Sequence, residues 1–224
     1  MSIVVSPAFG MTPGAPVRSG LETRGLVYVG MPDSPDARQT ATDAVRAAIN
    51  RINTRTYRML ETYFDITFVL DTMDYKIPTD VRSTRRVELL DTSGIPRRNL
   101  DFKNPQTFRI EHQNAAVARN PRVYTLLSYP QDGLLSLESK PQQAWINTYP
   151  TGRLWYRRTV QYPAAGEIVD VPPNFYDFLE WYVKWHLATV HAPKRASVAR
   201  QSWGEAEVVM KMEDNEFDDW SERN

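Results

Sequence analysis

Three histidines are the residues most able to bind a metal or to move a proton at neutral pH: His112, His186 and His191. His186 and His191 stand five positions apart, whereas two metal ligands on one face of a helix stand four apart. The chain has no cysteine, which removes thiolate metal sites, thiol catalysis and disulfides. We therefore predict no metal site.

Acidic side chains that could work as a general acid and base gather at one predicted helix start: Asp170, Asp177 and Glu180. Carboxylates are also common at helix starts, where they cap main-chain N–H groups and offset the helix dipole. The sequence contains no phosphate-binding loop, nucleophile elbow or dinucleotide fingerprint. We predict a protein that is not an enzyme, with no catalytic residue and no cofactor.

Basic side chains outnumber acids in the middle of the chain: Arg82, Arg85, Arg86, Arg97, Arg98, Lys103 and Arg109. Such a cluster can contact DNA phosphates or an acidic partner, and it can equally be an ordinary solvated surface. The four candidates for contact with DNA or with an acidic partner are Arg85, Arg86, Arg97 and Arg98. Because total charge is zero, any electrostatic function must be regional.

Aromatic side chains at strand spacing offer a further chemistry, the stacking of a ligand on a sheet: Trp145, Tyr149, Trp155 and Tyr156. The same pattern is typical of core residues. A sheet-based ligand-binding module therefore stays open as one function of this protein.

The composition is that of a soluble protein with a sizeable core, because 42% of the 224 residues are hydrophobic and 24% are charged. The start lacks the basic region and the long apolar core of a secretion signal. The sequence contains no uninterrupted apolar span of membrane-crossing length. We expect a protein made in the cytoplasm, without a membrane partner.

Residues 1–39 alternate prolines with glycines, which predicts an extended N-terminal arm with one short strand over 25–31. The arm is either a disordered leader or a segment that orders against a neighbouring subunit. Four apolar residues favour a segment that orders against a neighbour, because apolar side chains are unfavourable in a solvated tail: Ile3, Val4, Val5 and Phe9.

Helical periodicity predicts a first helix over 41–63, with Thr40 and Asp43 at the spacing of a capping box. Its apolar face consists of Val45, Ile49, Ile52, Met59, Leu60 and Tyr63. A β-rich region over 66–162 follows, broken by one short helix from Asn104 to about His112. The strand candidates lie at 66–70, 75–78, 86–91, 124–129, 134–138, 144–149 and 154–162, and their short connections predict an antiparallel sheet.

Two helices are predicted at the end of the chain, over 173–192 and 194–212, separated by Pro193. The second has an expected apolar line of Val198, Trp203, Ala206, Val209 and Met210. Residues 213–224 form an acidic tail, whose charges at a helix C-terminus oppose the helix dipole. The predicted fold class is α+β.

Several of these segments, in their order and spacing, resemble the head-to-tail connector or adaptor proteins of tailed bacteriophages. The resemblance covers about 40–212. It rests on the predicted middle strands and on four motifs: Ala48-Ile49-Asn50-Arg51-Ile52 in the first helix, the extended Asp74-Tyr75-Lys76-Ile77-Pro78-Thr79-Asp80, the Val171-Pro172-Pro173 entry with Tyr176 and Leu179, and Glu205-Ala206-Glu207 in the last helix. None of these motifs is catalytic.

The resemblance implies a helical bundle made from the N-terminal and two C-terminal helices, with a central antiparallel β region. It implies a virion structural protein that forms a ring of about twelve copies under the portal, extends the DNA channel and attaches the tail. DNA would pass without sequence specificity. The portal-interaction candidates are Phe217, Asp218, Asp219 and Trp220, which can also be read as a frayed acidic end. A tail-tube or tail-completion protein is the alternative within the same particle.

Overall fold

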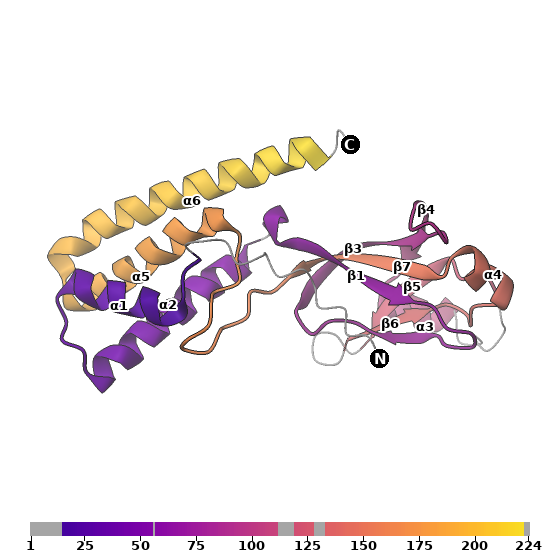
Figure 1. The fold of residues 1–224 in the computed structure, drawn as a ribbon, viewed down its shortest axis with the longest axis horizontal. Coiled ribbons are helices and arrows are strands. Elements are labelled where there is room, and N and C mark those ends of the chain that lie inside the picture. The colour runs from indigo at the N-terminus through magenta and orange to yellow at the C-terminus, as the bar shows by residue number, and fades with distance from the viewer. Residues whose placement is uncertain (1–14, 56, 112–118, 128–132, 222–224) are drawn as a thin grey trace. The chain divides into compact units, whose positions relative to one another are not determined.

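The computed structural model describes residues 15–55, 57–111, 119–127 and 133–221, with side chains up to Asn215. The chain divides into two compact units, and Figure 1 labels their elements. Among the described residues, 61–158 form a sheet unit, and the segments 15–60 and 159–221 together form a helical unit. The α+β class predicted from the sequence is confirmed.

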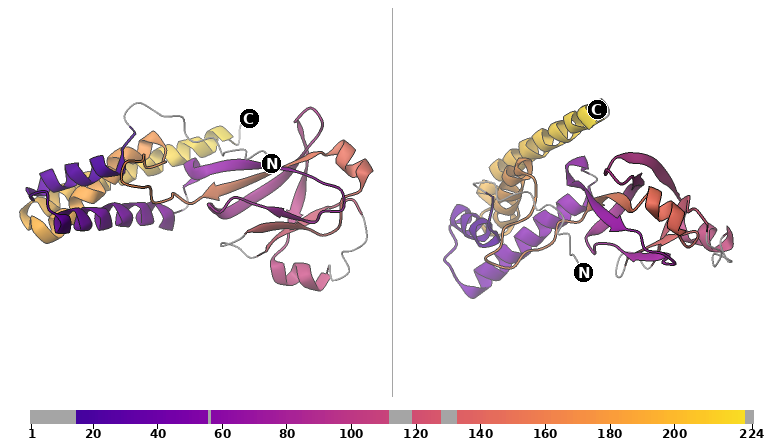
Figure 2. Two further views of the ribbon diagram at one scale, coloured as in Figure 1. Left: turned by 60° about the horizontal axis from the view of Figure 1, so that its bottom comes forward. Right: turned by 45° about the vertical axis from the view of Figure 1, so that its right-hand side comes forward.

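The helical unit is built around one central helix, α5 (Tyr176–His191). The other three long helices pack against α5: α1 (Arg18–Val29), α2 (Pro35–Thr54) and α6 (Pro193–Ser221). Figure 2 shows α1, α2 and α5 running side by side. Their shared core includes Val45, Ile49, Leu179 and Val183. Short 3₁₀ turns, η1 (Arg58–Leu60) and η2 (Pro173–Phe175), complete the unit.

The prediction of an extended arm with a strand over 25–31 is wrong for residues 18–29, which form helix α1. Residues 1–14 of the predicted arm lie outside the described part of the chain. The glycines of α1 help to position the helix. A Cβ at Gly25 would lie 2.7 Å from Leu187 Cδ1, so glycine allows α1 to approach α5 closely. Gly30 adopts φ 73° and ends the helix in the left-handed conformation that glycine favours. The buried apolar face of Leu21 and Leu26 then outweighs the low helix propensity of glycine.

Helix α2 begins six residues earlier and ends nine residues earlier than predicted. Ser34 is its N-cap and accepts a hydrogen bond from the Ala37 N–H at 3.2 Å, with Pro35 in the first turn. Thr40 and Asp43 are therefore inside the helix and form no capping box. The inward face is confirmed for Val45, Ile49 and Ile52, whereas the predicted residues from Met59 onward lie beyond the helix.

The described residues of the sheet unit form seven strands in the order β1-β7-β3-β4-β5-β6-β2. Their bounds are β1 (Glu61–Thr67), β2 (Asp74–Lys76), β3 (Val81–Leu90), β4 (Pro96–Phe102), β5 (Val123–Leu127), β6 (Leu134–Leu137) and β7 (Thr151–Arg158). Two short helices, α3 (Pro105–Glu111) and α4 (Gln143–Thr148), lie in its connections. The core beneath the sheet includes Val87, Leu89, Leu135, Leu154 and Tyr156.

The sheet differs from the prediction in three ways. It is mixed rather than antiparallel, because β4 and β5 pair in parallel through Asp101↔Val123 and Phe102↔Tyr124. Strand β4 was not predicted. The segment predicted as a strand over 144–149 falls mostly within helix α4, where the Tyr149 N–H donates to the Trp145 carbonyl oxygen at 2.8 Å. Both aromatics pack on one core, and a spacing of four residues allows this in a helix and in a strand alike, so the spacing did not distinguish the two.

The C-terminal helices were predicted in the right places with different ends. Pro193 occupies the first position of α6 as well as following α5, and α6 continues to Ser221 instead of ending at 212. Its predicted apolar line is only partly inward: Met210 is fully buried, whereas Val198 and Val209 are 58% and 52% exposed. Within the described residues, no helix has the length and apolar character needed to cross a membrane.

Candidate interaction surfaces

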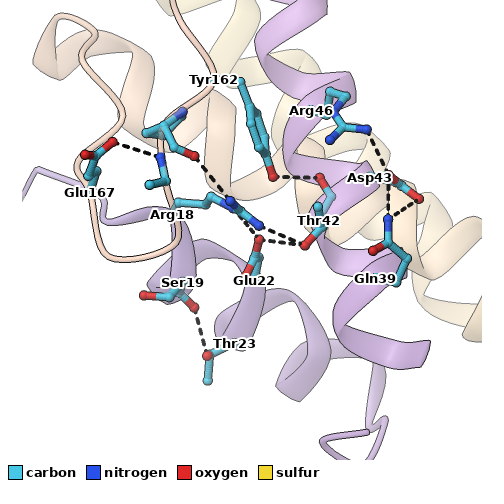
Figure 3. A network of polar contacts seen from close by, with 12 residues as sticks. Arg18, Ser19, Glu22, Thr23, Gln39, Thr42, Asp43, Arg46, Tyr162 and Glu167 are labelled. Atoms are coloured by element: carbon cyan, nitrogen blue, oxygen red, sulfur yellow. Dashed lines mark hydrogen bonds and ion pairs between the residues drawn. The ribbon is translucent and has the colours of Figure 1, made fainter. Parts of the chain in front are cut away.

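The N-terminus of α1 is held by a loop, residues 163–169, rather than by a side-chain cap (Figure 3). The N–H groups of Arg18 and Ser19 donate to the carbonyl oxygens of Glu167 at 3.0 Å and Ala165 at 3.1 Å. These bonds satisfy donors that the first turn of any helix leaves without a partner. Main-chain pairing thus stabilises a helix whose first turn contains no acidic residue.

The Arg18 side chain links three segments of the helical unit at the same place (Figure 3). It donates to Glu22 at 2.8 Å, to the Pro163 carbonyl oxygen at 3.2 Å and to the Thr42 hydroxyl at 3.2 Å. Its guanidinium also lies 4.7 Å from the ring centre of Tyr162, and burial raises the pKa of that tyrosine. We call this set the Arg18 junction. It fixes α1 to α2 and to the loop after β7.

A buried glutamate joins α6 to the end of α2. Glu207 is 8% exposed and is surrounded by three cations: Arg51 at 3.2 Å, Arg55 at 3.8 Å and Lys211 at 3.5 Å. A carboxylate this buried is stable only when it is paired, and the surrounding cations supply that pairing. Glu207 also belongs to the Glu205-Ala206-Glu207 motif that carried the sequence resemblance. Its role in the described chain is to dock α6.

Asp214 makes the next contact along α6. It is 9% exposed and accepts a hydrogen bond from the Met59 N–H in η1 at 2.8 Å. The sequence assigned this residue to a separate acidic tail, and the structure corrects that boundary because Asp214 is part of the helical unit. The four portal-interaction candidates, Phe217 to Trp220, continue α6 as main chain, but their side chains lie outside the described residues.

Aromatic rings fill the contact between α5 and α6. Trp203 of α6 lies 5.6 Å from Tyr182 and 5.4 Å from Trp185, measured between ring centres.

Two grooves border helices α5 and α6. One of 660 Å³ includes Trp185 and Gly204 in its lining. The other, of 480 Å³, combines Trp181 and Val209 with three carboxylates, Asp177, Glu205 and Glu213.

The four candidate arginines lie on two neighbouring strands, and three of them are already paired with carboxylates. Arg85 contacts Glu61 at 2.6 Å, Arg86 contacts Glu88 at 2.7 Å and Arg97 contacts Asp91 at 2.7 Å. Arg98, on β4, is exposed and makes no ion pair within the described part of the chain. These pairings reduce the positive field that the sequence alone indicated.

A second face of the sheet was missed by sequence reasoning. On the side opposite the core, β1, β7 and β3 present alternating acids, arginines and aromatics: Glu61, Tyr63, Asp65, Arg86, Glu88, Arg153, Trp155 and Arg157. We call it the arginine–aromatic face. The Arg-x-Trp-x-Arg alternation over 153–157 is the signal that could have found it.

The residues of the arginine–aromatic face contact one another. Arg153 donates to both carboxylate oxygens of Asp65, at 2.8 and 3.0 Å, and lies 4.3 Å from the Tyr63 ring centre. Trp155 donates through Nε1 to Glu88 at 2.7 Å and lies 5.3 Å from Tyr63. Bidentate pairing and ring contacts of this kind hold side chains in a single arrangement.

The sheet-based ligand platform predicted as an alternative is not assembled. Trp145 and Tyr156 are buried in the core beneath the sheet, at 5% and 0% exposure, and Tyr149 packs against that core. Only Trp155 of the four lies on the arginine–aromatic face. The four rings therefore do not share a surface on which a ligand could stack.

The residues considered for catalysis make different structural contacts. Glu180 pairs with Arg24 at 2.9 Å and Lys184 at 2.7 Å, while Asp177 lines the 480 Å³ groove. His186 stacks on Tyr182 with ring centres 6.4 Å apart, and His112 lies outside the described residues. In the part of the chain that the structure describes, no group of three His, Cys, Asp or Glu side chains is placed to hold a metal.

The fold and these surfaces define an α+β protein with two units, whose charged and aromatic residues form structural contacts and outward faces. The particular family follows from comparison with known proteins. A family model described as SU10 adaptor protein matches residues 19–219, and the chain belongs to the SU10 adaptor protein family. Membership agrees with the resemblance to phage adaptors seen in the sequence. A comparison with curated proteins finds no match.

Proposed function

We propose that this protein is a head-to-tail adaptor of a bacteriophage particle. About twelve copies form a ring under the portal, extend the DNA channel and provide the attachment site for the tail. The observation that carries the proposal is the adaptor-family match over residues 19–219, which spans the described elements of both units from α1 to α6.

The length of α6 supports the portal side of the proposal. α6 has 29 residues and α5 has 16, which makes α6 about 20 Å longer at 1.5 Å per residue. Its main chain continues for two further turns after Asp214, the residue that anchors it to Met59. We propose that this extension binds the portal, with Phe217 and Trp220 as aromatic anchors.

The charge distribution supports the DNA side. An adaptor channel must let the genome pass, and a strongly basic lining would retain DNA through its phosphates. The chain has zero net charge, and Arg85, Arg86 and Arg97 are paired with carboxylates. We propose a loose, salt-sensitive contact with passing double-stranded DNA, without sequence specificity.

The role proposed is structural. The protein acts in the virion, at the interface between head and tail, and its partners are further copies of itself, the portal and the tail tube or nozzle. No catalytic step, cofactor or membrane partner is part of the proposal.

The test is assembly with the portal ring encoded in the same genome. Native mass spectrometry and negative-stain imaging would follow this protein alone and after mixing with that ring. A closed ring of about twelve copies added to the portal is the expected result. Failure to bind the portal, with assembly on tail proteins instead, would replace the proposal with that of a tail component.

A further inference from the structure

Among the described residues, the 480 Å³ groove beside α5 and α6 is lined by three carboxylates and by no lysine, arginine or histidine. We call it the acidic groove. The carboxylates belong to Asp177 on α5 and to Glu205 and Glu213 on α6, two helices that pack along each other (Figure 1). On α6 the lining runs from Ser202 to Glu213, eleven positions or about 16 Å at 1.5 Å per residue. The groove is therefore long enough to contact several side chains of a partner.

The carboxylates of the acidic groove differ from other acids on the same two helices. Glu180 of α5 and Glu207 of α6 are each paired with cations. Within the described residues, Asp177 and Glu213 make neither an ion pair nor a hydrogen bond. Glu205 accepts a hydrogen bond at 2.9 Å from a neutral glutamine one turn earlier on α6. The negative charge of the groove is therefore left for a cation from outside the described chain.

One oxygen of Glu213 points to the same conclusion. Glu213 Oε2 is buried from solvent and has no hydrogen-bond partner among the described residues. A carboxylate oxygen removed from water without a partner destabilises the structure that contains it. A donor that enters the groove beside Glu213 would remove this penalty.

The acidic groove also has an apolar part, formed by Trp181 and Val209. Val209 is 52% exposed. Trp181 lies beside Lys184, whose Nζ is 4.1 Å from the ring centre, but that lysine is paired with Glu180 and does not line the groove. An aliphatic side chain placed against Trp181 and Val209 would remove apolar surface from water.

The spacing of the acids favours an elongated partner over a single ion. Glu205 and Glu213 stand eight positions apart on α6, which is about 12 Å. In the part of the chain that the structure describes, no group of three His, Cys, Asp or Glu side chains is placed to hold a metal. Donors that are spread along a peptide chain match this spacing.

We infer that the acidic groove binds a basic segment of a partner protein. Lysine or arginine side chains of that segment pair with Asp177, Glu205 and Glu213. An aliphatic side chain between them packs on Trp181 and Val209. The groove is lined only by residues up to Glu213, so this surface is separate from the proposed portal anchors, and its binding does not depend on the proposed ring.

The experiment titrates the full-length ¹⁵N-labelled protein with a capped synthetic peptide, Lys-Ala-Leu-Arg-Ala-Leu-Lys. The readout is the NMR signal of the Trp181 indole N–H, assigned with Trp181→Phe. One analogue has glutamine in place of the three cations, and a second has serine in place of both leucines. The basic peptide should shift the Trp181 signal to saturation, and each analogue should bind about tenfold or more weakly.

Two variants with the same change in net charge locate the site. Asp177→Asn, Glu205→Gln and Glu213→Gln together should weaken peptide binding by about tenfold or more. The control combines substitutions at three exposed acids outside the groove: Asp43→Asn, Asp71→Asn and Asp101→Asn. At about 0.15 M salt, distant charges are screened, so the control should change the affinity by less than about twofold. Thermal unfolding of both variants checks that each is folded.

Equal affinity for the basic peptide and its glutamine analogue would overturn the inference, because the groove would then be a purely apolar site. Equal loss of affinity in the two variants would also overturn it, since the attraction would be long-range. So would the absence of a saturable shift up to about 1 mM peptide, or the same shift caused by Mg²⁺ alone. The assay contains no portal, so failure of portal assembly leaves this inference intact, and failure of peptide binding leaves the proposed function intact.

Discussion

Asp214 of α6 accepts a hydrogen bond from the main-chain N–H of Met59 at 2.8 Å, across 155 positions of sequence. The contact places the last acidic segment of the chain partly inside the helical unit. A helix that would otherwise present anions at its unfavourable end is anchored by one of those anions before it continues to Ser221. Asp214 therefore belongs to the helical unit rather than to a separate acidic tail.

Removing the Asp214 carboxylate should destabilise the protein. Asp214→Ala leaves the Met59 N–H without its acceptor, and we expect a loss of about 1–2 kcal/mol in the free energy of unfolding. Asn215→Ala, at the exposed neighbouring position, is the control and should change stability by less than about 0.5 kcal/mol. Urea unfolding of both variants measures the difference. Equal stability of the two would show that this hydrogen bond contributes little.

Truncation should separate folding from portal binding. Deleting residues 216–224 retains Asp214, so the free energy of unfolding should stay close to that of the full chain while portal affinity falls by about tenfold or more. Deleting residues 214–224 should reduce both quantities. Thermal unfolding and pull-down on the portal ring measure them. Undiminished portal binding by the shorter deletion would rule out the proposed role of Phe217 and Trp220.

Replacing two helical glycines by alanine should change the free energy of unfolding in opposite directions. Alanine favours a helix over glycine by about 1 kcal/mol in both cases. At Gly204 of α6 a Cβ meets nothing within 4 Å, so Gly204→Ala should raise the free energy of unfolding by about 0.5–1 kcal/mol. At Gly25 the Cβ would lie 2.7 Å from Leu187, so Gly25→Ala should lower it by about 1–3 kcal/mol. Stabilisation by both substitutions would mean that α1 and α5 separate easily.

The helical unit should lose stability at high pH through Tyr57. Burial, reinforced by Glu207, raises the pKa of Tyr57 to about 12, against about 10 in an unfolded chain. The folded state thus holds the phenol proton more tightly. The resulting stability, up to about 2 kcal/mol, is complete below pH 10 and disappears as pH rises through 12. Tyrosinate absorbance of Tyr57→Phe should lack one group that titrates near pH 12 in the wild-type protein; an unchanged titration curve at that pH would contradict this assignment.

The DNA contact should depend on few arginines. Replacing Arg85, Arg86, Arg97 and Arg98 together by glutamine should weaken retention of double-stranded DNA and lower its dependence on salt. Because three of the four are paired, most of the change should come from Arg98 alone. Binding measured over a salt series compares Arg98→Gln with the fourfold variant. An unaltered salt slope in the fourfold variant would remove this surface from the channel.

Much of the fold follows from local pattern. The Pro172-Pro173 entry, the aromatic periodicity after it, and the short helix after Asn104 were all readable from the sequence, because caps, prolines and periodic apolar residues act within a few positions. Local pattern failed where one signal had two meanings. Trp145 and Tyr149 fit a helix as well as a strand, because residues four apart share a face in both, and it is the hydrogen bond from the Tyr149 N–H to the Trp145 carbonyl oxygen that identifies the helix.

The sequence by itself determined the α+β class, the order of helical and β-rich segments and the inward face of α2 at Val45, Ile49 and Ile52. Only the tertiary structure decided that a glycine-rich segment becomes α1, that Asp214 belongs to the helical unit, and that Arg85, Arg86 and Arg97 are paired. The physical reason is distance along the chain. Gly25 fits its position because Leu187 of α5 occupies the space that a side chain at position 25 would fill. Asp214 is buried because the Met59 N–H supplies it with a hydrogen-bond donor. Neither partner can be read from the residues beside it.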